Sequence, residues 1–156
     1  MSHLNRIRGV ANYQFGENIG EQMFSKEIEI AFSKRTGRIR HLYLDGKLLA
    51  TLRPTDGFFS LTIAGAQKLC TIVKAPRFRV VITETVEEFA KKGRNIFARH
   101  VIKADLELRS GEETIITDDN DRVLAVGRAL LTGSEMLAFK RGVAIKTRRG
   151  VDESKQ

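Results

Sequence analysis

The chain has 156 residues, of which 42% are hydrophobic and 29% charged, enough to build one large domain or two small ones. Its 27 Lys and Arg residues exceed the 19 Asp and Glu residues, and the resulting net charge of +8 favours a polyanionic partner. The N-terminus lacks the apolar core of a signal peptide, and no apolar run approaches the roughly 18 residues of a membrane span. We therefore expect a cytoplasmic protein with no membrane partner.

The cysteine and histidine content argues against a disulfide, a zinc site or a thiol nucleophile. Cys70 is the single cysteine, and its place in a helical apolar pattern predicts a small buried residue. The three histidines, His3, His41 and His100, are scattered and lack the spacing of metal ligands. We expect neither a metal nor another cofactor.

The first part of the chain, residues 1–76, predicts a small α+β domain. A helix, a helical turn and three strands are expected over residues 4–15, 19–24, 27–30, 38–44 and 47–53. Asp45-Gly46 between two strand-like runs is typical of a tight hairpin with positive φ. Ser60 is expected to cap the next helix, which carries Cys70 and ends before Ala75-Pro76.

The second part, residues 77–151, predicts a small mixed or antiparallel barrel with short helices, followed by a polar tail over residues 152–156. Strands are expected over residues 78–82, 95–102, 113–117, 122–131 and 143–148. Thr85 and Glu88 form a capping-box pattern for a helix that Gly93 would end in a left-handed conformation.

An acidic turn, Asp118 to Asp121, resembles the start of a calcium-binding loop. A calcium loop needs glycine at its sixth position, where this chain has Val123, and glutamate at its twelfth, which this chain also lacks. We expect an ordinary hairpin turn.

The last two strands combine apolar residues with glycines and clustered cations. Five basic residues and no acidic one lie between Lys140 and Arg149, a pattern typical of a surface that approaches a phosphate backbone. Strand alternation places Lys146 and Arg148 on one face. The alternative is a solvated edge strand protected by its cations. The residues of this region that we expect to contact RNA are Gly127, Arg128, Lys140, Arg141, Gly142, Lys146 and Arg148.

A second candidate cluster surrounds the glycine that ends the preceding helix. Its members are Lys92, Gly93, Arg94, Phe97 and Arg99. Glycine would let an anion approach backbone amides, whereas the alternative is a helix stop between solvated cations. The phenylalanine either stacks on an unpaired base or belongs to the core.

A third group of cations lies in the first half of the chain. Its members, Lys34, Arg35, Arg38 and Arg40, would extend the RNA footprint. A charge run of this kind is also typical of a solvated hairpin.

The segment GEETIITDDNDRVLAVGRALLTGSEMLAFKRGVAIKTRRG resembles the PUA domain, named for pseudouridine synthases and archaeosine transglycosylases. It is most similar to the C-terminal part of archaeosine tRNA-guanine transglycosylases, and GFFSLTIAGAQKL resembles the smaller domain that precedes the PUA domain there. One departure is Glu112 after Gly111, where aspartate is frequent. The resemblance implies a pseudo-barrel of about six strands that recognises structured RNA, in the transglycosylase the acceptor stem and 3′ end of tRNA.

These patterns favour a non-catalytic RNA-binding protein that could present tRNA, or another structured RNA, to an RNA-modifying enzyme. The chain is too short for the barrel that holds the transglycosylase's catalytic aspartates and zinc. It also lacks a phosphate loop, a nucleophile elbow and a dinucleotide fingerprint. The alternative is a protein-interaction adaptor or assembly subunit that keeps the fold without RNA affinity.

Overall fold

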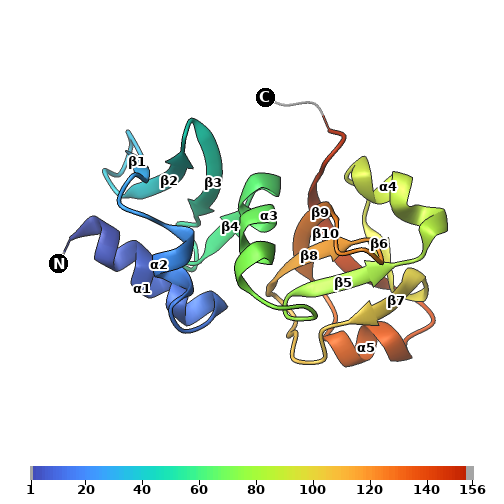
Figure 1. The fold of residues 1–156 in the computed structure, drawn as a ribbon. Helices are drawn as coiled ribbons and strands as arrows, with labels where there is room; N and C mark the ends of the chain where they lie inside the picture. The colour runs from blue at the N-terminus through green and yellow to red at the C-terminus, as the bar shows by residue number, and fades with distance from the viewer. Residues whose placement is uncertain (1, 154–156) are drawn as a thin grey trace. The chain divides into compact units, whose positions relative to one another are not determined.

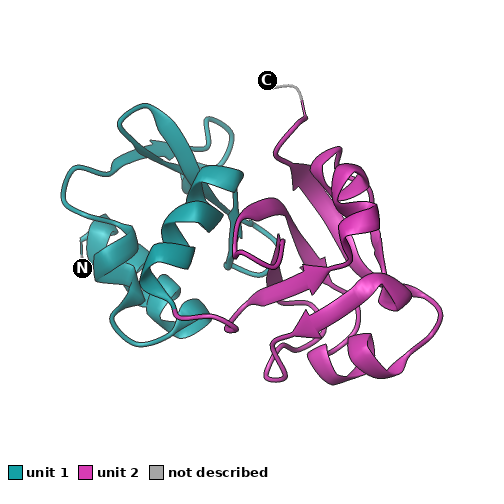
Figure 2. Ribbon diagram, turned by 45° about the vertical axis from the view of Figure 1, so that its right-hand side comes forward, with its two compact units in different colours: residues 1–73 teal, residues 74–156 magenta. Residues whose placement is uncertain are grey.

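The structure is a computed structural model that describes residues 2–153, so the last three residues of the expected polar tail lie outside the described part. The chain forms two compact units, residues 1–73 and residues 74–156 (Figures 1 and 2). The sheets and helices of both units confirm the α+β class. Among the described helices, none is both long enough and apolar enough to cross a membrane.

The first unit packs three helices with one antiparallel sheet in the order β1-β2-β3-β4 (Figure 1). Its elements are α1 (His3–Phe15), α2 (Ile19–Met23), β1 (Glu29–Phe32), β2 (Ile39–Leu44), β3 (Lys47–Leu52), β4 (Phe59–Leu61) and α3 (Ile63–Ile72). Asp45 and Gly46 join β2 to β3 with φ values of 51° and 78°, which confirms the expected hairpin turn. Ile7, Leu42 and Phe59 are among the residues that fill the core.

Two expectations for this unit are wrong. The cap of α3 is Thr62, whose hydroxyl oxygen accepts a 3.0 Å hydrogen bond from the Gly65 amide, because Ser60 lies within the short strand β4. Cys70 is only half-buried, since α3 directs its neighbours Ala66 and Leu69 into the core.

The second unit is a six-stranded mixed sheet that forms a nearly closed barrel, with strand order β6-β10-β9-β8-β5-β7. Its elements are β5 (Arg79–Ile82), η1 (Glu84–Val86), α4 (Glu87–Lys91), β6 (Ile96–Phe97), η2 (Ala98–His100), β7 (Val101–Ala104), β8 (Glu113–Thr117), β9 (Val123–Ala129), α5 (Gly133–Ala138) and β10 (Val143–Gly150). Among the described strands of this sheet, β5 and β8 are the one pair that runs in parallel. Ile82, Leu108, Met136 and Ile145 are fully buried within its core.

The expected strand over residues 95–102 does not form as one element. The turn η2 divides it into β6, which pairs with β10, and β7, which pairs with β5. The expected capping box at Thr85 is also wrong, because η1 occupies that position and α4 has no side-chain cap. Thr132 and Glu135 form a capping box at α5 instead.

Two turn predictions for this unit are confirmed. Gly93 follows the end of α4 with a φ of +86°. The Asp118 carboxylate accepts hydrogen bonds from the amides of Asn120 (2.9 Å) and Arg122 (3.0 Å), and thereby closes the hairpin between β8 and β9.

A buried carboxylate fixes the start of β5. Asp105 accepts hydrogen bonds from the Arg77 guanidinium (2.6 Å) and from the amides of Phe78 (2.8 Å) and Glu107 (2.9 Å). Burial alone would raise the pKa of Asp105, but the hydrogen bonds from Phe78 and Arg77 together hold that pKa below its ordinary value.

Candidate nucleic-acid interface

Strand β10 brings the two predicted clusters of the second unit together. It pairs with β6 along one edge, where Val143 lies opposite Phe97, and with β9 along the other, where Lys146 lies opposite Arg128. The sequence places these partners far apart, and only the strand order makes them neighbours. We call this set, with the loop before β10, the β10 surface; its members are Phe97, Arg99, Arg128, Lys140, Arg141, Gly142 and Lys146.

Arg128 and Lys146 form the cationic centre of the β10 surface. Both side chains are exposed, and they are direct cross-strand partners on one face of the sheet. The Arg128 Nε donates a 3.2 Å hydrogen bond to the Gly111 carbonyl oxygen, which holds the guanidinium beside the segment that leads into β8. Lys146 makes no ion pair with any described residue, so its charge is open to a ligand.

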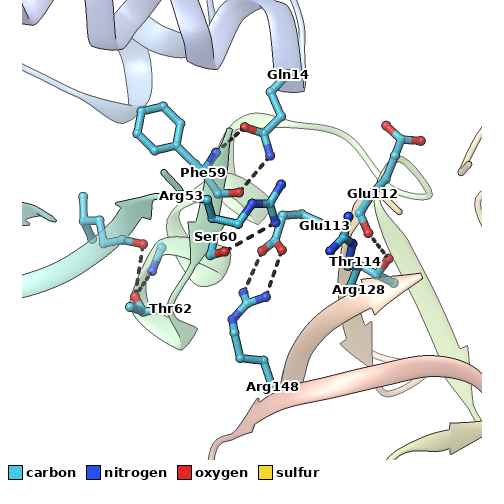
Figure 3. A network of polar contacts seen from close by, with 12 residues as sticks. Gln14, Arg53, Phe59, Ser60, Thr62, Glu112, Glu113, Thr114, Arg128 and Arg148 are labelled. Atoms are coloured by element: carbon cyan, nitrogen blue, oxygen red, sulfur yellow. Dashed lines mark hydrogen bonds and ion pairs between the residues drawn. The ribbon is translucent and has the colours of Figure 1, made fainter. Parts of the chain in front are cut away.

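Arg148 lies near the same face but is held by a carboxylate of the protein. Its guanidinium forms two parallel hydrogen bonds to Glu113, of 2.9 Å and 2.7 Å (Figure 3). The Glu113 side chain is only 2% exposed, so the arginine offsets a charge that burial makes costly. Arg148 therefore joins β10 to β8, and sequence reasoning missed Glu113 as its partner.

Gly127 is buried, and its missing side chain serves the packing of the sheet. A Cβ at this position would collide with the Lys146 carbonyl oxygen on β10. The close approach expected here is thus to a neighbouring strand of the protein itself.

The loop before β10 is open to solvent. Lys140 and Arg141 are exposed and form no ion pair within residues 2–153. Gly142 follows with a φ of +94°, and nothing lies within 4 Å of the place where its Cβ would stand. Its carbonyl oxygen accepts a 2.9 Å hydrogen bond from the Ala98 amide, which fixes the loop beside Phe97.

Gly93 ends a helix and offers no free amide to a ligand. Its N–H donates to the Ala90 carbonyl oxygen at 2.9 Å. A Cβ on Gly93 would collide with the Glu153 carboxylate, which itself accepts a 2.7 Å hydrogen bond from the Gly150 amide. Of this second predicted cluster, Lys92 and Arg94 remain exposed cations on either side of the glycine.

Phe97 is 43% exposed, which rules out the core alternative for this ring. His100 contacts it edge-on with ring centroids 6.4 Å apart, and the Arg99 guanidinium lies 5.6 Å from its centroid. The ring thus has a cation over one face and a histidine ring beside it, and it keeps exposed area for an unpaired base.

Among the described residues, no three or more His, Cys, Asp or Glu side chains are grouped so as to bind a metal ion. The positions predicted in the first unit, Lys34, Arg35, Arg38 and Arg40, lie in or beside the turn that connects β1 to β2 and are exposed or half-exposed.

Two family models match adjacent parts of the chain. The patch-forming domain C2 of tRNA-guanine transglycosylase matches residues 5–76, and the PUA domain matches residues 78–151. The chain is a PUA-domain protein. Its PUA domain follows a domain of the transglycosylase C2 type, as the resemblance implied.

The curated relatives are archaeal enzymes of much greater length. The tRNA-guanine(15) transglycosylase of Pyrococcus furiosus is 46% identical over 149 residues, which cover 96% of this chain and 25% of the enzyme. The enzyme of Pyrococcus abyssi is 43% identical over 145 residues, which cover 93% of this chain and 24% of the enzyme. The PUA-domain chain thus spans about a quarter of these relatives, namely their C-terminal module.

Solved structures share the fold at low sequence identity. A hypothetical protein from Pyrococcus horikoshii superimposes with a TM-score of 0.75 at 22% identity, covering 96% of this chain and 90% of that one. A PUA-domain structure from Aeropyrum pernix superimposes with a TM-score of 0.72 at 14% identity, covering 99% and 85%. These likenesses establish the fold of this PUA-domain protein.

Proposed function

We propose that this PUA-domain protein is a non-catalytic RNA-binding protein that recognises the acceptor stem and 3′ end of tRNA or of another structured RNA. The observation that carries the proposal is the β10 surface, where exposed cations that form no ion pair with any described residue flank an exposed aromatic ring. The curated relatives are named for action on tRNA, which supports tRNA as the ligand. Presentation of the RNA to a modifying enzyme on a separate chain completes the proposed role.

Binding at the β10 surface would combine electrostatic contacts to phosphates with stacking on a base. Lys146, Arg128, Lys140 and Arg141 would neutralise backbone phosphates, a contribution that does not depend on sequence. Phe97 would stack on a base at the 3′ end, because a base there is unpaired and its face is free to contact the ring. Arg148 would act through the protein, by holding β10 against β8 through Glu113.

The test combines one substitution with one change to the RNA. Phe97→Ala should weaken binding of an intact tRNA transcript about fivefold or more, because each base–aromatic stack contributes roughly 1–3 kcal/mol. The same substitution should have little effect on a transcript that lacks its 3′-terminal nucleotides. Fluorescence anisotropy at low salt measures all four affinities.

Phe89→Ala is the matched control, because Phe89 is also an exposed phenylalanine and lies on α4, outside the β10 surface. It should leave both affinities unchanged. Equal loss with intact and trimmed RNA would remove end recognition from the proposal. Absence of binding to every structured RNA at low salt would overturn RNA binding and favour the adaptor.

A further inference from the structure

The first unit contains a cationic cavity that is separate from the β10 surface. It has a volume of about 850 Å³ and is lined by the start of α1, the turn between β1 and β2, and the turn between β3 and β4. That volume falls in the range of about 300–1,000 Å³ that is usual for small-ligand sites. Five arginines line it, and no acidic residue does: Arg6, Arg35, Arg38, Arg40 and Arg53.

Most of this positive charge has no counter-charge among the residues that the structure describes. Arg53 pairs with Asp56 at 3.0 Å. For the other four arginines, no ion pair joins them to any residue in the described range. Like charges around a cavity repel one another, so a bound anion would lower the free energy of this arrangement. Arginine is suited to that anion because its planar guanidinium can bind two phosphate oxygens at once.

The turn that carries two of these arginines is held by its own hydrogen bonds. The Ser33 amide donates to the Arg38 carbonyl oxygen at 2.8 Å, and the Gly37 amide donates to the Ser33 carbonyl oxygen at 2.8 Å. The Ser33 hydroxyl oxygen accepts a further bond from the Thr36 amide at 3.3 Å. The backbone that presents Arg35 and Arg38 is thus ordered before any ligand binds, which reduces the entropy lost on binding.

An aromatic ring lines the same cavity. Phe32, at the end of β1, is 43% exposed, and His3 on α1 contacts it edge-on with ring centroids 5.1 Å apart. An exposed ring that a neighbouring ring holds in place can stack on a base. A concave site of this kind does not match a flat anionic membrane surface. Phosphate-binding cations beside a stacking platform are the components of a single-stranded nucleic-acid site.

We infer that this cavity binds a nucleotide of an unpaired RNA strand, with its phosphates on Arg6, Arg35, Arg38 and Arg40 and its base on Phe32. The assignment rests on the proposed function, because it makes the cavity a second RNA contact beside the β10 surface. It differs from the solvated-hairpin alternative in requiring Arg6, which comes from a distant part of the chain.

The experiment compares two charge reversals of equal size in the full chain. Arg35→Glu/Arg38→Glu removes two cations from the cavity, and Lys26→Glu/Lys47→Glu removes two exposed cations of the same unit that do not line it. Anisotropy with a labelled ten-nucleotide oligouridine should show a loss of about tenfold or more for the arginine variant relative to the lysine variant. Circular dichroism establishes that both variants remain folded.

Two further variants test the stacking contact. Phe32→Ala should weaken oligouridine binding about fivefold or more, whereas Tyr13→Ala, which removes an exposed ring outside the cavity, should not. Equal affinities of the two alanine variants would overturn the nucleotide assignment, as would equal affinities of the two charge reversals.

A double variant of the β10 surface tests the proposed function separately from this inference. If Arg128→Glu/Lys146→Glu abolishes tRNA binding while the cavity variants retain all affinity for both RNAs, the cavity assignment falls and the proposed function stands. If Arg128→Glu/Lys146→Glu leaves tRNA affinity unchanged, the β10 surface is not the tRNA site, whatever the cavity binds.

Discussion

At the scale of single residues, two cations of β10, Lys146 and Arg148, differ in whether the protein neutralises their charge. Lys146 faces solvent without an ion pair in the described structure, whereas Arg148 is fixed on the buried Glu113. Strand alternation predicted that the two share a face. It could not predict their different surroundings, because Glu113 lies 35 residues away and reaches Arg148 only when β8, β9 and β10 pair.

This difference predicts that removing each charge changes the stability of the protein by a different amount. Arg148→Ala should lower the free energy of unfolding by about 3 kcal/mol, because it strips a buried carboxylate of its bidentate partner. Lys146→Ala should change that free energy by no more than about 0.5 kcal/mol. Urea unfolding followed by circular dichroism measures both values. Similar stabilities of the two variants would mean that the ion pair with Glu113 does not hold β10.

At the scale of elements, local patterns predicted what local interactions determine. The spacing of apolar residues gave α1, and Asp45-Gly46 gave the hairpin of β2 and β3, because their hydrogen bonds join residues near in sequence. The prediction of a single strand over residues 95–102 was wrong, because the hydrogen bonds of this stretch join residues that are far apart in sequence. Its halves pair with β10 and β5, and nothing within the stretch records that choice of partners. The three-residue strand β4 was missed because it is too short to show alternation.

Asp105 ties the segment after β7 to the start of β5, and this contact should depend on pH. Its folded-state pKa is depressed, so the unfolded chain binds a proton more readily as the pH falls. The contribution of Asp105 to stability is therefore present above the unfolded pKa of about 3.9 and is lost as pH falls through the folded value. Asp105→Asn should cost about 2 kcal/mol at pH 7 and progressively less below pH 4.

Urea unfolding of wild type and Asp105→Asn at pH 7 and pH 3 measures this difference. Asp119→Asn is the control, because Asp119 forms an exposed 3.2 Å ion pair with Lys103, and its substitution should cost at most about 1 kcal/mol. A stability difference between wild type and Asp105→Asn that is the same at both pH values would contradict the linkage.

At the scale of the whole molecule, the cations that give the net charge of +8 include two defined clusters, one in each unit. Composition predicted the polyanionic partner, and the charge run at residues 34–40 indicated part of the first site. The run could not indicate the cavity itself, because His3 and Arg6 reach it only through the packing of α1 beside the sheet. The same limit hid the pairing of β6 with β10, without which Phe97 and Lys146 would be unrelated residues.

The salt dependence of RNA binding tests whether the charge of the β10 surface lies on phosphate. Each phosphate that a protein neutralises releases counterions, so the slope of log affinity against log salt concentration counts such contacts. Arg128→Ala/Lys146→Ala should reduce the magnitude of that slope for tRNA by about 1.4–1.8, which corresponds to two phosphate contacts. Lys26→Ala/Lys47→Ala removes the same total charge from positions outside both sites and should leave the slope nearly unchanged. Because the slope does not depend on the fraction of folded protein, it separates a lost contact from a lost fold. Equal slopes for the two double variants would place the phosphates elsewhere on the molecule, even if Arg128→Ala/Lys146→Ala bound RNA more weakly.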